Sequence, residues 1–355
     1  MRSTVLVFVL AAACAAAGSS ATTRASAGGA TLGQLVGQRL IVAMRGTTPS
    51  NALLARVRAG EVGGVILFGG NVRNAPQVRA LTQALLTAAR AGGQPSLLIA
   101  VDQEGGATRR LAWAPPLRVA AELGRLTPAE VRAEGKATAD ALQAVGVNVD
   151  LAPVVDVPRG RNSFIAAQAR AFSTDPQRVA SLATAFAGGL ADGGVAATAK
   201  HFPGLGRAQV STDVQAVAVL APRARLNADL LPYGRLIGAG VPMVMLSNAT
   251  YTALDAKPAA WSPAVQTLLR RTLGFTGVTI TDALDAVAPT HGRSVRSAAV
   301  LAAQAGVDLL LVAGSEAESD AVYRRLVDAA EAGKIPRPGL ERSFARILAL
   351  KHRIT

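Results

Sequence analysis

One short segment holds the densest group of side chains that could take part in chemistry. It begins with Lys200 and His201, passes through a turn containing Pro203, and ends at Asp213. The apolar run 195–199 comes directly before it, which predicts a buried strand that delivers a cation and an imidazole into a loop. An α/β barrel builds its active site in this way, at the carboxyl ends of its strands.

Two aspartates follow other apolar runs in the same manner. Asp102 comes directly after the run 97–101, and Asp282 comes after the run 278–281. Each could be a simple capping residue, Asp282 for the next helix and Asp102 for a turn. Two carboxylates at one barrel mouth are also the minimum set for glycoside hydrolysis, one as nucleophile and one as general acid and base. Arginine and lysine beside them would donate hydrogen bonds to sugar hydroxyls.

Other kinds of active site find little support in the sequence. The three histidines form no H-E-x-x-H pattern, and a single cysteine allows neither a paired-cysteine metal motif nor an internal disulfide. The glycine-rich spots lack the G-x-G-x-x-G and Walker patterns of nucleotide-binding loops, and no G-x-S-x-G elbow occurs. We therefore predict that the protein uses no metal and no cofactor.

Eight apolar runs of strand length divide the chain, and nearly all are separated by segments long enough for a helix. The runs are 40–44, 64–68, 97–101, 147–157, 195–199, 241–246, 278–281 and 308–313. Thr127 and Glu130 form a capping box at one helix start. Asp175 before Pro176 opens another helix, which Gly193 closes. This alternation predicts an α/β fold with a single (β/α)8 TIM-type barrel, and a doubly wound open sheet is the alternative.

The composition fits a barrel and argues against a nucleic-acid-binding protein. Half of the 355 residues are hydrophobic and only 4% are aromatic, so Ala, Val, Leu and Ile must form the core. The formal net charge is +14, but the basic residues are scattered and are not interleaved with aromatic ones. Such a charge could attract anionic cell-wall polymers or a membrane surface, or it could simply reflect a solvated, arginine-rich surface.

Residues 1–30 are predicted to be a signal peptide and polar tether, ahead of a barrel domain at 31–355. The apolar stretch 5–13 is too short to span a bilayer but has the length of a signal-peptide core. Cys14 follows three alanines, a position that resembles a bacterial lipoprotein acylation site, although Ala11 stands where Leu is usual. We expect export to the cell envelope or beyond, with lipid attachment at Cys14 or cleavage further along the chain.

Six collinear segments relate the chain to a known family. They are GGVILF at 63–68, VDQEGG at 101–106, NVDLAPVVD at 148–156, RAFSTDP at 170–176, KHFPG at 200–204 and LGFTGVTITDAL at 273–284. From about residue 32 to its C-terminus the chain resembles a family 3 glycoside hydrolase of the single-domain β-N-acetylhexosaminidase kind. The resemblance implies that Asp282 is the catalytic nucleophile of a retaining mechanism. It also implies that the terminal sugar is held by Asp102, Arg110, Arg170, Lys200 and His201.

The loop after Lys200 departs from the family pattern. Relatives read K-H-F-P-G-H-G-x-x-x-x-D-S-H, in which the last Asp and His form the acid/base pair, whereas this chain reads K-H-F-P-G-L-G-R-A-Q-V-S-T-D. Leu205, Ser211 and Asp213 stand at the three changed positions. Asp213 is the one ionisable side chain at that end of the loop, and it could act as the acid/base if an apolar setting raised its pKa. Otherwise the second step is slow, or the protein binds glycans without turning them over.

We therefore expect a retaining glycoside hydrolase that releases terminal β-linked N-acetylglucosamine from peptidoglycan-type fragments or chito-oligosaccharides. The alternatives are a catalytically degenerate glycan-binding envelope lipoprotein and a β-glucosidase-like hydrolase. The expected partners are a carbohydrate, no nucleic acid, and a membrane if Cys14 is acylated, and the expected state is a monomer. The exact sugar, and whether water or phosphate accepts it, stay open from the sequence.

Overall fold

The strands of the barrel lie where the apolar runs predict them. The computed structural model describes residues 29–160 and 162–354, and within these ranges eight parallel strands form one sheet in the order β11-β9-β7-β6-β3-β2-β1-β12. A parallel bridge between Ile280 and Leu309 joins the two outer strands and closes the sheet. The (β/α)8 barrel is therefore confirmed, and the open sheet is ruled out. The strands are β1 (Leu40–Ala43), β2 (Gly64–Leu67), β3 (Leu98–Val101), β6 (Val149–Asp150), β7 (Ala196–Phe202), β9 (Met243–Leu246), β11 (Val278–Thr281) and β12 (Leu310–Val312).

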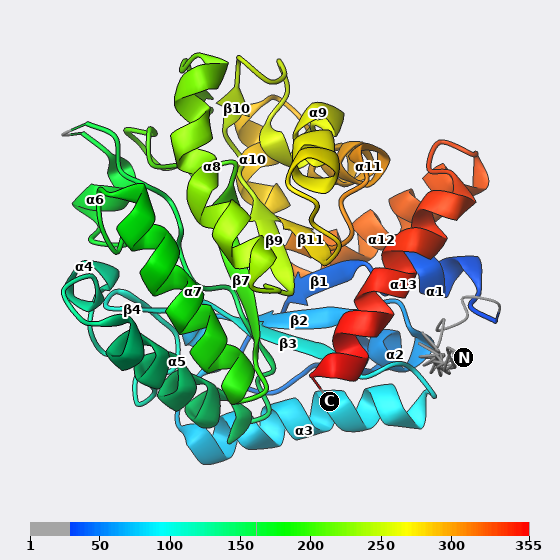
Figure 1. Cartoon of the computed structure of the whole chain (residues 1–355). Coiled ribbons are helices and arrows are strands. Elements are labelled where there is room, and N and C mark those ends of the chain that lie inside the picture. Colours follow the sequence, from blue (N-terminus) through cyan, green and yellow to red (C-terminus); the bar gives the residue numbers. More distant parts are fainter. Residues whose placement is uncertain (1–28, 161, 355) are drawn as a thin grey trace, which may run out of the picture.

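Helices alternate with the strands and surround them (Figure 1). The longer ones are α2 (Asn51–Ala59), α3 (Ala75–Ala91), α5 (Pro128–Gln143), α7 (Pro176–Asp192), α8 (Arg223–Gly238), α11 (Val295–Ala305), α12 (Glu316–Glu331) and α13 (Arg337–Arg353). The shorter ones are α1 (Leu32–Gly37), α4 (Ala120–Leu123), α6 (Phe164–Ala167), α9 (Pro263–Thr267) and α10 (Leu284–Thr290), with the 3-10 turns η1 (Gly69–Asn71) and η2 (Ala259–Trp261) and the π-helical turn η3 (Leu268–Thr272).

Two small strand pairs lie at the carboxyl ends of the barrel strands. β4 (Gln103–Gly105) pairs antiparallel with β5 (Thr108–Arg109), and β8 (Ala218–Val219) pairs parallel with β10 (Thr250–Tyr251). Each pair shapes a loop that follows a barrel strand, so these loops have a defined course at the mouth of the barrel.

The predicted helix boundaries are present. Thr127 and Glu130 form the capping box of α5, and the Asp175 side chain accepts hydrogen bonds from the first backbone N–H groups of α7. Gly193 is the C-cap of α7. These caps satisfy backbone groups that a helix cannot pair internally, which explains why short polar signals in the sequence located both helices.

The barrel interior is closed at one end. Alternate strand residues such as Ile41, Met243 and Ile280 point inward and form a core separate from the larger one between strands and helices. Helix α13 crosses the amino-terminal end of the strands and adds Ile347 and Leu350 to this inner core (Figure 1). A pocket in the barrel can therefore open only at the carboxyl ends of the strands.

Two strands differ from their predicted extents. The run 147–157 contributes only β6, because Pro153 has no backbone N–H to donate to a ladder, and beyond it Val154 makes a single bridge to Lys200. In contrast, β7 continues past Ala199 through His201 and Phe202. Lys200 and His201 are thus held in the strand itself, and their orientation is fixed by the sheet.

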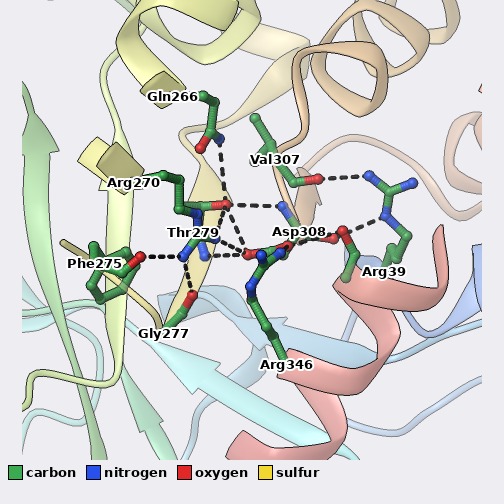
Figure 2. Close-up of polar contacts among 10 residues, drawn as sticks. Arg39, Gln266, Arg270, Phe275, Gly277, Thr279, Val307, Asp308 and Arg346 are labelled. Carbon is green, nitrogen blue, oxygen red and sulfur yellow. Dashed lines mark hydrogen bonds and ion pairs between the residues drawn. The ribbon is translucent and has the colours of Figure 1, made fainter. Parts of the chain in front are cut away.

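The seam between β11 and β12 is held by a buried carboxylate at the closed end of the barrel (Figure 2). Asp308 is fully buried and accepts hydrogen bonds from the backbone N–H of Thr279 at 2.9 Å and from Arg346 of α13 at 3.0 Å, and it also pairs with Arg270. Arg39, directly before β1, donates to the backbone carbonyl of Asp308 at 3.1 Å. One carboxylate therefore ties the seam to η3 and to α13.

Replacing that carboxylate should destabilise the barrel strongly. Asp308→Asn leaves Arg270 and Arg346 without a counter-charge, and we expect the free energy of unfolding to fall by about 3 kcal/mol. Chemical denaturation measures this, with Asp328→Asn on the exposed side of α12 as the control, expected within about 0.5 kcal/mol of wild type. Equal stability of the two variants would contradict the claim that Asp308 holds β11 and β12 together.

Cys14 and the predicted signal segment up to residue 28 lie outside the described residues. Among the described residues, none of the helices is long and apolar enough to cross a membrane.

Candidate active site

A cavity of about 410 Å³ opens at the carboxyl ends of the barrel strands. Its floor is apolar and comes from inward-facing residues of the barrel, among them Ile66, Leu151 and Met245. Its walls include every side chain that the sequence analysis singled out for catalysis or sugar binding: Asp102, Arg110, Arg170, Lys200, His201, Asp213 and Asp282. The structure thus brings together residues that are up to 180 positions apart in the chain.

Lys200 is the centre of a buried ion-pair cluster in this cavity. Its ammonium nitrogen lies 2.7 Å from Asp102 Oδ1 and 2.6 Å from Glu104 Oε1, and its side chain is only 3% exposed. Glu104 also binds Arg170 through two hydrogen bonds of 2.7 Å, in the bidentate geometry that fixes a guanidinium plane. Arg110 lies 3.4 Å from Asp102 Oδ2. The cluster joins β7 to the loops that follow β3 and β6.

Mutual neutralisation keeps this cluster charged although it is buried. Burial alone would raise the pKa of Glu104, but Lys200 and Arg170 outweigh it and lower that pKa to about 2. Burial likewise opposes ionisation of Asp102, and Lys200 and Arg110 bring its pKa below the usual value. Burial lowers the pKa of Lys200, whereas the two carboxylates raise it above its usual value. Fixed charges are therefore present at the cavity wall before any ligand binds.

His201 is oriented by a second buried carboxylate, Asp156. The Nδ1 atom of His201 lies 2.7 Å from Asp156 Oδ2. The other carboxylate oxygen, Oδ1, accepts the backbone N–H groups of His201 at 3.1 Å and of Leu205 at 2.6 Å. Asp156 is fully buried, so it holds both the imidazole ring and the start of the following loop. The ring is left with Nε2 as its second nitrogen, and the side chain lines the cavity.

Asp282 follows β11 and is not a helix cap. Its Oδ1 accepts the backbone N–H of Ala283 at 2.8 Å, whereas α10 begins at Leu284 and has no side-chain cap. Burial raises the pKa of Asp282, His201 counteracts this, and the nearby Asp213 raises it further. The capping alternative for Asp282 therefore fails, and the carboxylate stays available to the cavity.

The loop after β7 has a fixed base and an exposed tip. Gly206 accepts the backbone N–H of Arg159 at 2.9 Å, and the Arg207 side chain pairs with Asp229 of α8 at 2.7 Å. Leu205, which stands where relatives have a histidine, is buried and lines the cavity. Asp213 is exposed, and it too lines the cavity. The loop therefore presents a carboxylate from its tip to the rim of the pocket.

Sequence reasoning missed three acidic residues of the site. Glu104 holds Arg170 and Lys200, and Asp156 holds the imidazole of His201. Asp285 lines the cavity and accepts the backbone N–H of Ala313 at 2.6 Å. A signal for Glu104 was present, because residues two apart in an extended strand point to the same side, and Asp102 is two residues earlier. Asp156 also had a signal, since it stands at the end of the apolar run 147–157, whereas the contact of Asp285 with Ala313 is long-range and left no local signal.

No group of His, Cys, Asp and Glu side chains in the described part of the chain is arranged to hold a metal ion.

Comparison with known proteins identifies the family of this site. The model described as the glycosyl hydrolase family 3 N terminal domain matches residues 31–350. The chain belongs to glycosyl hydrolase family 3. It is 36% identical over 328 residues to an uncharacterized secreted glycosyl hydrolase of Arthroderma benhamiae, which covers 90% of this chain and 93% of that protein.

Two further relatives narrow the comparison. A beta-hexosaminidase of Alkalilimnicola ehrlichii is 36% identical over 301 residues, covering 81% of this chain and 84% of its own length. The crystal structure of a beta-N-acetylhexosaminidase from Beutenbergia cavernae matches with a TM-score of 0.84 at 33% identity, covering 91% of this chain and 99% of that one. The family resemblance expected from the sequence motifs is confirmed, and the chain is a family 3 glycosidase.

The ion-pair cluster makes a pH-dependent contribution to the stability of this family 3 barrel. Folding lowers the pKa of Glu104 from 4.5 to about 2. The ionised Glu104 therefore adds its full share to the free energy of unfolding above pH 4.5, and this share is lost as the pH falls from 4.5 towards 2. We expect Glu104→Gln to lower the free energy of unfolding by about 3 kcal/mol at neutral pH, with the difference shrinking across that window.

Denaturation curves at a series of pH values measure this difference. Glu341→Gln is the control, since Glu341 forms an exposed ion pair with Arg337 on α13 and should change stability by less than about 0.5 kcal/mol at any pH. A deficit in Glu104→Gln that stays constant from neutral pH down to 2 would contradict the proposed charge state.

Proposed function

We propose that this chain is a retaining exo-glycosidase that releases terminal β-linked N-acetylglucosamine from peptidoglycan-type fragments or chito-oligosaccharides. The observation that carries the proposal is the placement of Asp282 in one closed-ended cavity with the charged cluster around Lys200. A pocket with an apolar floor and a single opening suits the end of a glycan better than its middle. The amino sugar is supported by the relatives, two of which are named for hexosaminidase activity.

The charged cluster would hold the terminal sugar. Asp102 can accept hydrogen bonds from sugar hydroxyls, and Arg110 and Arg170 can donate to others. Glu104 fixes Arg170 by its bidentate contact, and Lys200 is fixed between two carboxylates, so these donors do not have to be reorganised when the sugar binds. His201, oriented by Asp156, would contact the sugar on the side of Asp282.

Asp282 would be the nucleophile. Its carboxylate attacks the anomeric carbon while the bond from that carbon to the leaving oxygen breaks, and the leaving oxygen takes a proton from the acid/base residue. Water then attacks the covalent intermediate, gives its proton to the same acid/base residue, and frees the Asp282 carboxylate. The ionised form of Asp282 is required for the first step, and His201 opposes the effect of burial on its pKa.

Asp213 would be the acid/base residue of this reaction. It replaces the histidine of the usual pair, and it is the carboxylate that the loop tip brings to the cavity. It also acts electrostatically on Asp282, which supports a location close to the scissile bond. Glycan binding with very slow turnover is the second candidate, and the absence of the usual Asp and His at positions 211 and 213 favours it.

We further propose that residues 1–30 direct export and that 31–355 act as one catalytic domain. The match to a protein named as a secreted glycosyl hydrolase supports export. Acylation of Cys14, a monomeric state, and activity without a cofactor are parts of the same proposal. Cys14→Ala should then convert a form that stays in the membrane fraction through a high-salt wash into one that the wash releases.

Removal of the nucleophile is expected to abolish turnover without unfolding the barrel. Asp282→Asn should lower kcat by at least about 10³-fold, because an amide cannot form the glycosyl ester. The matched control is Asp285→Asn, three residues later in the same cavity, which should stay within about tenfold of wild type. Near-normal hydrolysis of an aryl N-acetyl-β-glucosaminide by Asp282→Asn would sink the assignment.

Substitution of Asp213 separates the two candidate functions. Asp213→Ala should impair substrates with poor leaving groups far more than activated aryl glycosides, whose departure needs no proton. Added azide, which needs no general base, should restore turnover of the activated substrates. The control is Ser211→Ala, at the other changed position of the loop, which should keep the wild-type dependence on the leaving group. Equal slopes in a Brønsted series and no azide rescue would remove Asp213 from the mechanism and favour slow-turnover glycan binding.

A further inference from the structure

The largest exposed apolar side chains are confined to the mouth of the barrel. Five such side chains are exposed among the described residues, namely Trp113 at 39%, Leu117 at 60%, Val210 at 37%, Val214 at 74% and Leu220 at 79%. All five lie on two segments, 106–119 and 203–225, which we call the rim segments. Exposed apolar residues scattered singly are ordinary, but their confinement to the loops around one opening is not.

The rim segments are also strongly basic. Together they contain six arginines, at positions 109, 110, 118, 207, 223 and 225, and a single acidic residue, Asp213. Arg110 and Asp213 line the catalytic cavity, which leaves five arginines for a contact outside it. The rest of the chain has a far more even balance of the two charges. Apolar and cationic side chains are therefore combined on the same loops.

A hollow of about 530 Å³ beside the second rim segment is lined by both apolar and cationic side chains. Arg159, Arg207 and Arg225 line it together with the exposed Val210 and Leu220. Arg159 and Arg207 share one counter-charge, Asp229, at 2.9 and 2.7 Å, so the hollow keeps a net positive charge. A phosphate group bordered by apolar chains matches this lining.

None of the five apolar side chains lines the catalytic cavity, so they are not part of the sugar-binding pocket. A second copy of this chain is a poor partner, because a symmetric contact would bring the arginines of both copies together. A hydrophilic polyanion would satisfy the arginines but would leave the apolar side chains without a partner. The surface of an anionic bilayer offers both, with headgroup phosphates for the arginines and an apolar layer beneath them for the apolar side chains.

We propose that the rim segments dock on an anionic phospholipid bilayer, with the apolar side chains in the headgroup region and the arginines on the phosphates. Each arginine near an anionic surface and each buried apolar side chain adds to the affinity, so several weak contacts give reversible binding. Docking in this way turns the catalytic opening towards glycans close to the membrane. The contact is separate from any acyl chain on Cys14.

Vesicle binding of the full-length chain tests this proposal. Every protein carries Cys14→Ala, so that no acyl chain contributes. The vesicles are phosphatidylcholine alone or phosphatidylcholine with about one-third phosphatidylglycerol, and the chain should sediment only with the anionic ones. Trp113 is exposed and the only other tryptophan, Trp261, is buried, so a blue shift in fluorescence on binding should come from Trp113 and vanish in Trp113→Phe.

Two double variants test the apolar contacts and the arginine–phosphate contacts separately. Leu117→Ser with Leu220→Ser, and separately Arg118→Gln with Arg223→Gln, should each weaken binding to anionic vesicles by about tenfold or more. Each pair takes one exposed residue from each rim segment. The matched control, Arg58→Gln with Arg325→Gln, removes the same charge from exposed positions on α2 and α12 and should bind within about twofold of the parent.

Equal binding to both kinds of vesicle, or none to either, overturns the proposal. If the double arginine variant loses binding and the double leucine variant binds fully, the proposal is also overturned, and the rim segments are then a site for a polyanion. Hydrolysis of a soluble aryl glycoside is measured in parallel and should be unchanged in all these variants. Because vesicle binding needs no turnover, an inactive chain that still docks would refute the proposed function alone, and an active chain that does not dock would refute this inference alone.

Discussion

The contact between the buried Lys200 ammonium and two carboxylates is the constraint on which the rest of the site depends. A cation inside a barrel mouth is stable only if its attraction to nearby anions compensates for its lost hydration. Asp102 and Glu104 provide this attraction, at 2.7 and 2.6 Å from the Lys200 nitrogen. Those anions come from the loop after β3, and Glu104 in turn holds Arg170 from the loop after β6. Neighbouring strands are thereby joined at the mouth by charge as well as by their backbone ladders.

The same constraint separates two kinds of surface within the cavity. Polar groups that are already paired form one wall, and apolar residues of the barrel interior form the floor. Asp282 is not part of the paired cluster, and among the described residues the one hydrogen bond of its carboxylate comes from the backbone N–H of Ala283, at 2.8 Å. Burial raises the pKa of Asp282 more than His201 and Lys200 lower it, so this carboxylate is less strongly stabilised as an anion than the carboxylates of the cluster.

Most of the fold could be predicted because its signals are local. Eight apolar runs, the capping box at Thr127 and the cap at Asp175 each depend on residues close together in the sequence. The prediction of a strand over 147–157 was only partly right. The apolar residues continue past Pro153, but Pro153 has no backbone N–H to donate to the neighbouring strand. The extension of β7 through His201 was missed because polar residues in a strand look like the start of a loop until the fold supplies Asp102 and Asp156 as their partners.

The site was predictable to the extent that it follows strand ends. Asp102, Lys200 and Asp282 all stand directly after or at the end of apolar runs, and topology alone brings such positions together. The sequence could place Asp156 and Glu104 at the mouth, but they act on other side chains through contacts that span 45 and 96 residues, and no spacing in one sequence identifies those partners. Their roles therefore became visible only with the geometry.

We propose that Asp282 forms a covalent bond to the anomeric carbon of the sugar. Incubation with a fluorinated N-acetylglucosaminyl fluoride, which slows hydrolysis of the intermediate, followed by peptide mass spectrometry, tests it most directly. We expect one added sugar mass on the peptide that contains Asp282, present in the wild-type chain and absent from Asp282→Asn. An adduct on another residue, or complete turnover of an activated glycoside with inversion at the anomeric carbon, would contradict the role of Asp282 as nucleophile.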